Sequence, residues 1–225
     1  MSVLKGWLGE KLVQFGMWMN IDSQAYQRLH NVVIPSSNGP TQIDHILVSI
    51  YGVFVIETKN MKGWIFGEEK SSSWMQTIHG KKYPFQNPLH QNYRHTQCLA
   101  GFLQFDSTVF HSVVFFIGDA VFKSPMPDNV RSGGLSKYIK SFTAPLLTPD
   151  EVTKILGRLA STKSDPSLTK RKHLHSLKAR FSSTTVCPKC SGNLVERSAK
   201  TGRNAGNKFL GCSHYPSCKF TRAVG

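Results

Sequence analysis

Two apolar runs joined at Tyr51-Gly52 make up residues 42–60 (QIDHILVSIYGVFVIETKN), and charged side chains occur only toward their far ends. Runs this rich in β-branched and aromatic residues are typical of strands. Glycine at the second central position permits the positive φ that a two-residue hairpin turn needs. The pattern therefore predicts a β-hairpin in which Ile50 lies opposite Val53.

The hydrophobic period changes several times in the first 162 residues. Pro88 suits the first turn of a helix, in which Leu89, Tyr93, Ala100 and Leu103 fall near one face. Helices alternate with strands, which predicts a mixed α/β protein with helices covering a central sheet. The elements expected beside the hairpin are a helix over 8–19, strands near 63–67, 73–80 and 108–118, and a helix from a Thr148–Glu151 capping box to about Ser161.

Positive charge is concentrated in the C-terminal third of the chain. Residues 1–150 hold 13 Lys+Arg against 10 Asp+Glu, whereas residues 151–225 hold 15 against 3. Such a surface favours polyanions, of which nucleic acid is the commonest inside cells. An anionic membrane surface and a merely solvated basic face are the alternatives.

Changes in composition predict three parts: a main domain over residues 1–162, a basic linker over 163–184 and a small module over 185–225. The apolar N-terminal stretch is interrupted by charged residues, and no cleavage-site pattern follows it. No membrane span is evident either. These features predict a cytoplasmic protein.

The predicted hairpin brings charged side chains together at its open end. Continuing the pairing places Asp44 opposite Lys59, with Glu57 a diagonal neighbour of Asp44 on the same face. Two carboxylates at that spacing are hard oxygen ligands of the kind that Mg²⁺ takes, and a lysine beside them stabilises charge growing on phosphorus. The set suits metal-assisted phosphodiester hydrolysis. The alternative is a cross-strand ion pair at a solvated sheet edge.

Several separated motifs resemble, in the correct order, the nuclease-related domain (NERD) family over roughly residues 5–120. This family is considered a branch of the restriction-endonuclease-like PD-(D/E)XK nucleases, whose core is a helix, three or four mixed strands, a helix and a strand. The motifs are Gly9-Glu10, QIDHILV, GVFVIETKN, GWIFG, Trp74 and QNPLHQ. The resemblance implies a restriction-endonuclease-like mixed sheet flanked by helices.

Carried over residue by residue, the resemblance implies that Asp44 and Glu57 bind Mg²⁺ or Mn²⁺ and that Lys59 is the catalytic lysine. It adds Glu10 from the first helix and Gln91 from the helix at Pro88, although an exposed helix acid and a helix-surface amide are the alternatives. The implied activity is a metal-dependent deoxyribonuclease, and the alternative is a nuclease-like DNA-binding protein that no longer cuts.

The family pattern leaves two further points open. Many nucleases of this fold act in pairs, so a homodimer is compatible with the resemblance. The wider class often has proline before its first aspartate, whereas Ile43 precedes Asp44 here. That departure matches the NERD version of the motif.

Four cysteines occur as two close pairs in the C-terminal module, CPKC at 187–190 and CSHYPSC at 212–218. Two such knuckles predict a tetrahedral zinc site formed by Cys187, Cys190, Cys212 and Cys218. Disulfide pairing is the alternative, and it conflicts with a reducing compartment. The remaining Cys98 is expected to be a small apolar residue facing the core.

Residues 187–221 as a whole resemble the zinc ribbon near the C-terminus of type IA DNA topoisomerases. That resemblance implies a small β ribbon that binds single-stranded DNA. Aromatic side chains are interleaved with cations, which provides stacking faces beside phosphate partners, although the aromatics could instead cover the zinc site. The residues concerned are Lys208, Phe209, Tyr215, Lys219, Phe220 and Arg222.

Overall fold

The computed structural model describes residues 21–36, 39–189, 192–202, 204–216 and 218–223. The expected helix over 8–19, with Glu10, and the zinc ligand Cys190 therefore lie outside the described residues. The chain divides into two compact units, one containing residues up to 35 together with 41–166, the other containing 36–40 together with 167 onward.

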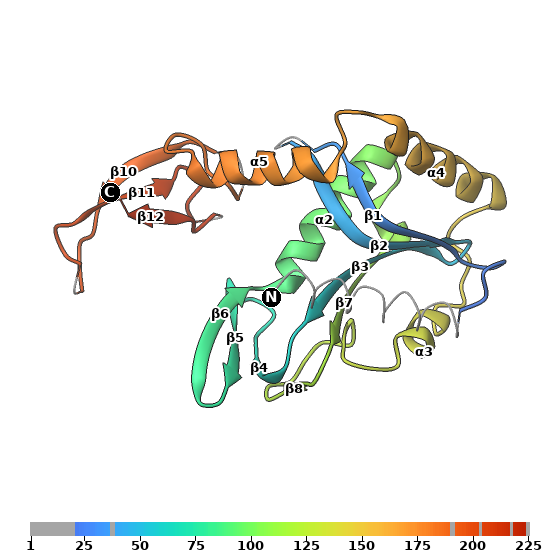
Figure 1. Ribbon diagram of the computed structural model, residues 1–225, viewed down its shortest axis with the longest axis horizontal. Helices are drawn as coiled ribbons and strands as arrows, with labels where there is room; N and C mark the ends of the chain where they lie inside the picture. The colour runs from blue at the N-terminus through green and yellow to red at the C-terminus, as the bar shows by residue number, and fades with distance from the viewer. Residues whose placement is uncertain (1–20, 37–38, 190–191, 203, 217, 224–225) are drawn as a thin grey trace. The chain divides into compact units, whose positions relative to one another are not determined.

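A five-stranded mixed sheet forms the centre of the first unit, in the order β1-β2-β3-β7-β9 (Figure 1). The first three strands are antiparallel, and β3, β7 and β9 are parallel. The predicted mixed α/β architecture is confirmed. The strands are β1 (Gln27–Ile34), β2 (Thr41–Ser49), β3 (Gly52–Asn60), β7 (Phe110–Ile117) and β9 (Val130–Arg131).

The hairpin of β2 and β3 forms as predicted, but its register differs by two residues. Ser49 pairs with Gly52, so the turn is centred on Ile50-Tyr51 rather than Tyr51-Gly52. Gly52 has a φ of 117°, and a Cβ there would lie 2.7 Å from the Val109 carbonyl oxygen. The glycine is therefore needed at the start of β3, where another segment approaches the backbone closely.

A register shift of two residues leaves every side chain on its predicted face, because the side-chain period of a strand is two. Ile46, Val48, Val53 and Val55 accordingly share one core cluster.

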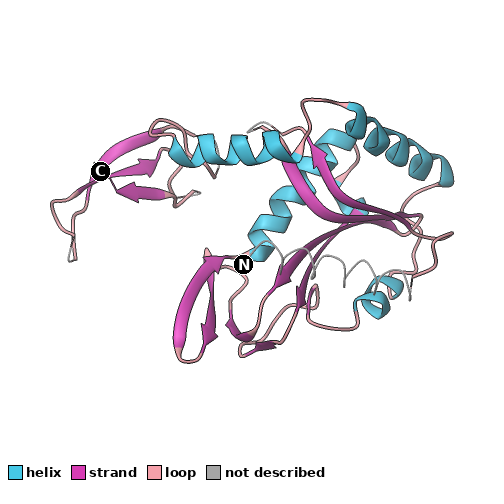
Figure 2. Cartoon of the chain, in the orientation of Figure 1, coloured by secondary structure: helices cyan, strands magenta, loops and turns pink. Residues whose placement is uncertain are grey.

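Helices cover both faces of the main sheet (Figure 2). Leu99 and Leu103 of α2 (Pro88–Leu103) and Ile155 and Leu159 of α4 (Pro149–Ser161) pack against one face. The opposite face packs against α3 (Leu135–Lys140). None of the helices among the described residues is long and apolar enough to cross a membrane.

Both longer helices begin where the sequence predicts. Pro88 occupies the first turn of α2, and the Asn87 side chain accepts a hydrogen bond from the backbone N–H of Leu89. The capping box of α4 between Thr148 and Glu151 is present in both directions. Tyr93 is expected on the same helical face as Leu89, Ala100 and Leu103, but those three are buried whereas its side chain is 63% exposed.

A second, four-stranded sheet in the order β6-β5-β4-β8 extends from the end of the main sheet. Its Trp74 stacks on Phe116 of β7, with ring centroids 6.2 Å apart and an interplanar angle of 5°. A Cβ at Gly67 would lie 2.2 Å from the Trp74 ring, so only glycine allows this packing. The strands are β4 (Gly63–Phe66), β5 (Ser73–Ile78), β6 (Lys81–Gln86) and β8 (Ala120–Phe122).

The described part of the second unit contains one helix, α5 (Lys170–Ser182), and a three-stranded antiparallel sheet. The strands are β10 (Leu194–Ser198), β11 (Lys208–Cys212) and β12 (Thr221–Ala223). Two short 3₁₀ turns, η1 (Ser107–Val109) and η2 (Thr162–Ser164), lie in the first unit. The small core of the second unit is formed around Cys187, Leu194 and Cys212.

Candidate active site and cysteine cluster

The β2–β3 ladder ends at the pair His45–Ile56, and the two strands then separate. β2 continues beside β1, and β3 continues beside β7. Asp44 and Glu57 are the first residues beyond the ladder, one on each strand. The separation of the strands therefore places two carboxylates beside each other at the end of a hydrophobic sheet.

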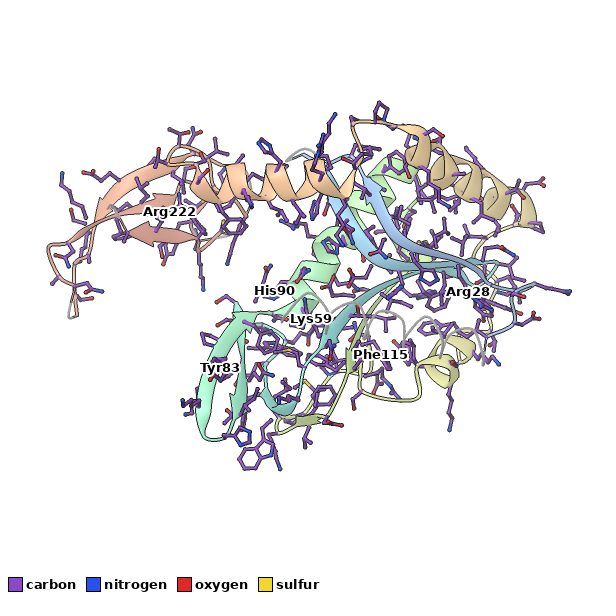
Figure 3. The ribbon with its side chains drawn as sticks, viewed as in Figure 1. Arg28, Lys59, Tyr83, His90, Phe115 and Arg222 are labelled. Atoms are coloured by element: carbon purple, nitrogen blue, oxygen red, sulfur yellow. The ribbon has the colours of Figure 1, made fainter. Side chains whose placement is uncertain are left out.

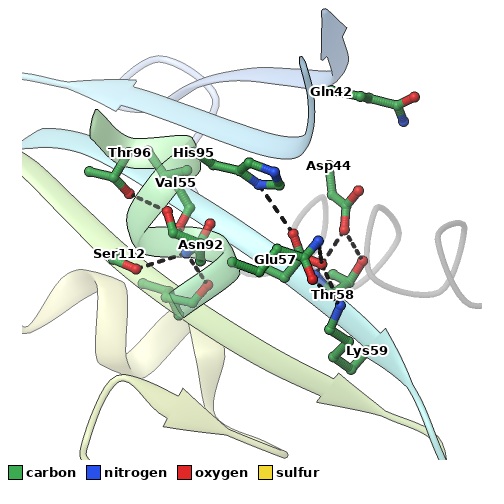
Figure 4. A network of polar contacts seen from close by, with 12 residues as sticks. Gln42, Asp44, Val55, Glu57, Thr58, Lys59, Asn92, His95, Thr96 and Ser112 are labelled. Atoms are coloured by element: carbon green, nitrogen blue, oxygen red, sulfur yellow. Dashed lines mark hydrogen bonds and ion pairs between the residues drawn. The ribbon is translucent and has the colours of Figure 1, made fainter. Parts of the chain in front are cut away.

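Asp44 bonds across this separation to β3. Its Oδ2 accepts hydrogen bonds from the backbone N–H of Thr58 at 3.0 Å and from the Thr58 hydroxyl at 2.9 Å (Figure 4). Its Oδ1 makes no hydrogen bond to a described residue. One carboxylate oxygen is thus fixed by the strand, while the other remains available for a ligand.

Glu57, Lys59 and Gln91 form a closed hydrogen-bonded triangle. Glu57 is 3% exposed, and its Oε1 accepts from Lys59 Nζ at 2.6 Å and from Gln91 Nε2 at 2.8 Å. The Gln91 carbonyl oxygen accepts from Lys59 Nζ at 2.9 Å. The first turn of α2 therefore contacts the end of β3, and four of the five predicted catalytic residues lie together, with Glu10 outside the described residues.

The second oxygen of Glu57 faces His95, one helical turn beyond Gln91. Glu57 Oε2 lies 3.4 Å from His95 Nδ1, at ion-pair distance (Figure 4). Both atoms are buried, and neither makes a well-formed hydrogen bond with a described residue. A buried polar atom without such a bond is costly, so this oxygen is suited to a ligand that the protein atoms alone do not supply.

The two carboxylates have opposite pKa shifts. Burial and the neighbouring Glu57 raise the pKa of Asp44 above its ordinary value, against the opposing hydrogen bonds from Thr58. Burial also acts to raise the pKa of Glu57, but the His95 imidazole and the Lys59 ammonium outweigh it and hold this pKa below its ordinary value. Divergent pKa values in neighbouring acids are typical of functional sites.

The donor set fits a small hard cation. Asp44 Oδ1 and Glu57 Oε2 are carboxylate oxygens without a hydrogen bond among the described residues. Mg²⁺ and Mn²⁺ prefer such oxygens and usually keep several waters when only one or two carboxylates bind them.

Two buried asparagines support the site, and sequence reasoning missed both. Asn92 Nδ2 donates to the carbonyl oxygens of Val55 and Val113 and to the Ser112 hydroxyl, which fixes α2 on β3 and β7. Asn87 Nδ2 donates to three carbonyl oxygens of residues 68–71. Their position among the core-facing residues of the helix could have identified them, because a buried amide needs hydrogen-bond partners.

Three of the four predicted zinc ligands form a cluster in the second unit. The Sγ atoms of Cys187, Cys212 and Cys218 all lie within 4.8 Å of one another. Cys187 Sγ and Cys218 Sγ are 3.7 Å apart. The fourth predicted ligand, Cys190, lies outside the described residues. Converging thiols at these separations fit a tetrahedral thiolate site for zinc.

The predicted nucleic-acid-binding residues lie on the three-stranded sheet and beside the cysteine cluster. Tyr215 is 60% exposed, and the Arg197 guanidinium lies 5.7 Å from the centre of its ring. Arg197, which the sequence did not single out, lines a surface pocket together with Phe209, Tyr215, Lys219 and Phe220.

The other predicted contacts have protein partners. Lys208 pairs with Glu196 at 2.7 Å, and Arg222 donates to the Ser183 carbonyl oxygen at 2.7 Å. Phe220 packs against the cysteine cluster, which was the alternative role for the aromatic residues.

The mixed sheet with these four polar side chains at its end agrees with a nuclease-related domain, and the sequence comparisons show that the chain belongs to the NERD family. The nuclease-related domain profile matches residues 5–117. An uncharacterized protein of Bacillus anthracis is 36% identical over 182 residues, which is 79% of this chain and 85% of that protein.

The C-terminal module matches the profile of the topoisomerase DNA-binding C4 zinc finger over residues 184–224. DNA topoisomerase 1 of Archaeoglobus fulgidus is 54% identical over 35 residues, which is 16% of this chain and 5% of that enzyme. No solved structure matches the chain. The chain thus combines a nuclease-related domain with a zinc finger of a DNA-binding type.

Proposed function

We propose that the chain is a Mg²⁺- or Mn²⁺-dependent deoxyribonuclease that hydrolyses phosphodiester bonds at Asp44, Glu57, Lys59 and Gln91. The observation that carries the proposal is the convergence of these four side chains where β2 and β3 separate. An ion pair at a solvated edge would not bury Glu57 to 3% exposure or recruit a helix to it.

Asp44 and Glu57 would hold the cation. When bound, a divalent ion supplies Lewis acidity that activates water and offsets charge on phosphate. The Lys59 ammonium, held by Glu57 and Gln91, stabilises the negative charge that develops on the phosphoryl oxygens. Gln91 orients Lys59 by accepting one of its protons in a hydrogen bond. Glu10, which lies outside the described residues, belongs to the proposal as a further acid that the family resemblance implies.

The C-terminal module would deliver DNA to the first unit, with a structural zinc bound by Cys187, Cys190, Cys212 and Cys218. Exposed Tyr215 offers a stacking face, and Lys219 with Arg197 offers cations to phosphate. Thiolates reserved for zinc favour a reducing compartment such as the cytoplasm.

The test incubates the full chain with supercoiled, linear and single-stranded DNA in the presence of Mg²⁺ or Mn²⁺. We expect cleavage by the wild type and a loss of at least about a hundredfold in Asp44→Ala and Lys59→Ala. Asp128→Ala and Lys140→Ala are the matched controls, because both residues are exposed and outside the site. Cleavage that persists in both site variants would refute the proposal.

A further inference from the structure

The small sheet presents one covered face and one open face. Ile65, Trp74 and Phe85 share the face that packs against the core. Strand alternation turns the neighbouring side chains to the other face, where Trp64 is 51% exposed and Phe66 is 39% exposed. We call this open side the outer sheet face; it comprises Trp64, Phe66, Met75, Lys82, Val121 and Lys123.

These residues form one patch rather than scattered exposures. Trp64 is the register partner of Val121 across β4 and β8, and Val121 is 48% exposed. Phe66 is the register partner of Met75 across β4 and β5. Single exposed apolar side chains are normal, but a contiguous patch of this kind marks an interaction surface.

The charges on the outer sheet face are positive. Lys123 Nζ lies 4.8 Å from the centre of the Trp64 ring, and Lys82 is the register partner of Thr77, beside Trp64. The four strands of the small sheet contain no aspartate or glutamate. Flat aromatic rings beside lysines fit the bases and phosphates of a nucleic acid strand. An uncharged apolar partner would leave the lysines without an anion.

Hydrogen bonds hold the strands that carry the outer sheet face. The Trp74 indole N–H donates to the Glu68 carbonyl oxygen at 3.0 Å, and the backbone N–H of Lys123 donates to Ile65 at 2.8 Å. Ser124 bonds both ways with the backbone of Gly67, at 2.8 Å each. The backbone that carries Trp64 and Phe66 is therefore held in place before a ligand binds, which lowers the ordering cost of binding.

The platform is also close to the candidate active site. Trp64 follows Lys59 by five residues, so their Cα atoms lie within about 18 Å (Figure 3, where Lys59 and Tyr83 mark the two sheets). This upper limit on the Cα separation corresponds to the length of about five nucleotides at a rise of about 3.4 Å each.

We propose that the outer sheet face binds a single-stranded stretch of the nucleic acid that the chain acts on, with bases stacked on Trp64 and Phe66. Lys123 and Lys82 contact the phosphates beside those bases. The inference rests on the proposed nuclease function for the identity of the strand, and it adds a second stacking site to the one on the zinc module.

The test measures the affinity of the full chain for a fluorescein-labelled oligothymidylate by anisotropy, in a Lys59→Ala background that prevents cutting. Trp64→Ala is expected to raise Kd about five-fold or more, and Trp64→Phe, which keeps a stacking face, is expected to restore most of the affinity. Lys123→Ala is expected to reduce the salt slope by about one. Leu146→Ala, at an exposed apolar residue elsewhere on the unit, is the control.

Photocrosslinking keeps the result clear if the zinc module dominates the total affinity. An oligonucleotide carrying 5-iodouracil is expected to crosslink to the peptide that contains Trp64 and Phe66. Crosslinks confined to the zinc module, with Kd unchanged in Trp64→Ala, would overturn the inference. Loss of binding to anionic vesicles, or of self-association, with unchanged oligonucleotide affinity would also overturn it. Failure of the chain to cut DNA affects only the proposed function, because binding is measured without cutting.

Discussion

The backbone N–H of Thr58 donates to Asp44 Oδ2 over 3.0 Å at the point where β2 and β3 stop pairing. The Asp44 carboxylate thus accepts from a backbone N–H of β3 at a position where the β2–β3 ladder has ended. The bond fixes one oxygen of Asp44 on β3 and leaves the other oxygen without a hydrogen bond to a described residue, where it could bind a ligand.

Thr58→Val removes the hydroxyl that bonds Asp44 at 2.9 Å and keeps both the backbone N–H and the β-branched shape. We expect the Mg²⁺ concentration for half-maximal cleavage to rise about ten-fold, because partners of metal ligands typically contribute ten- to a hundredfold. Thr153→Val, at a hydroxyl that bonds the Pro149 carbonyl on α4, is the control. Equal metal dependence in both variants would show that the hydroxyl does not position Asp44.

Gln91→Ala removes the hydrogen bond that Gln91 donates to Glu57 and the one that it accepts from Lys59. We expect kcat for cleavage to fall about a hundredfold, because Lys59 loses a hydrogen bond that orients it. The melting temperature should change little, because Gln91 is only partly buried. Gln97→Ala, at an exposed glutamine of the same helix, should leave the rate unchanged. A rate loss that Gln97→Ala shares would point to a general effect on the helix.

Asn92→Ala tests the attachment of α2 to the sheet. The substitution removes three hydrogen bonds and leaves two buried carbonyl oxygens without this donor. The expected loss is about 2 kcal/mol or more of unfolding free energy, which lowers the melting temperature of a chain of this length by about 4–8 °C. Calorimetry of Asn92→Ala against Gln97→Ala measures it, and a melting temperature within a degree of wild type would contradict this role.

Apolar periodicity and turn chemistry were enough to predict most of the first unit. The Pro88 and Thr148 helix starts and the apolar strand at 108–118 depend on local signals, and all are present. Asp44 and Glu57 could be placed on one face without the correct register, because face and register are separate properties of a strand.

The remaining features depend on tertiary packing. Gly52 looked like a turn residue, yet the approach of Val109 accounts for it, and that contact spans 57 positions that no local pattern connects. Tyr93 fits the apolar period of the helix but lies on its solvent side. Leu89, Ala100 and Leu103 of the expected stripe are buried, and the polar residues Asn92 and His95 are buried beside them.

His45 predicts acid sensitivity. Burial and the nearby His30 lower the pKa of His45 from 6.5 to about 3. The unfolded chain therefore binds a proton that the folded chain rejects, so stability is complete above about pH 6.5 and is lost as the pH falls toward about 3. We expect unfolding free energy to fall by about 1.4 kcal/mol per pH unit in this window from this one group.

Urea unfolding between pH 7 and pH 4 measures this dependence. The Nδ1 atoms of His30 and His45 lie 2.7 Å apart. The substitution His45→Gln keeps a polar partner for His30 but introduces a side chain that does not take up a proton. The slope of the unfolding free energy of His45→Gln against pH should therefore be smaller by the equivalent of about one bound proton. Equal slopes for wild type and His45→Gln would mean that another group causes the acid sensitivity; His111, whose pKa burial also lowers, is the first to replace.

Zinc removal should unfold the second unit and leave the first unit folded. The core of the second unit consists of little more than the cysteine cluster with Leu194, Leu210 and Phe220 around it, so without a metal it buries too little to remain folded. Chelation should make the amides of β10 and β11 exchange rapidly, while those of β3 and β7 stay protected. Thiol titration should rise by the four cysteines of the C-terminal module.

The matched variants are Cys212→Ser, which should lose zinc and the protection of the ribbon, and Cys98→Ser, which should keep both. Cys98 lies partly buried beside the main core and away from the cluster. If chelation left β11 protected, or if Cys187 and Cys218 formed a disulfide in the purified protein, the sulfur atoms 3.7 Å apart would serve a covalent bridge instead of a metal. Elemental analysis that finds one zinc per chain in Cys98→Ser and none in Cys212→Ser would establish the thiolate site, because only the ligand variant loses the ion.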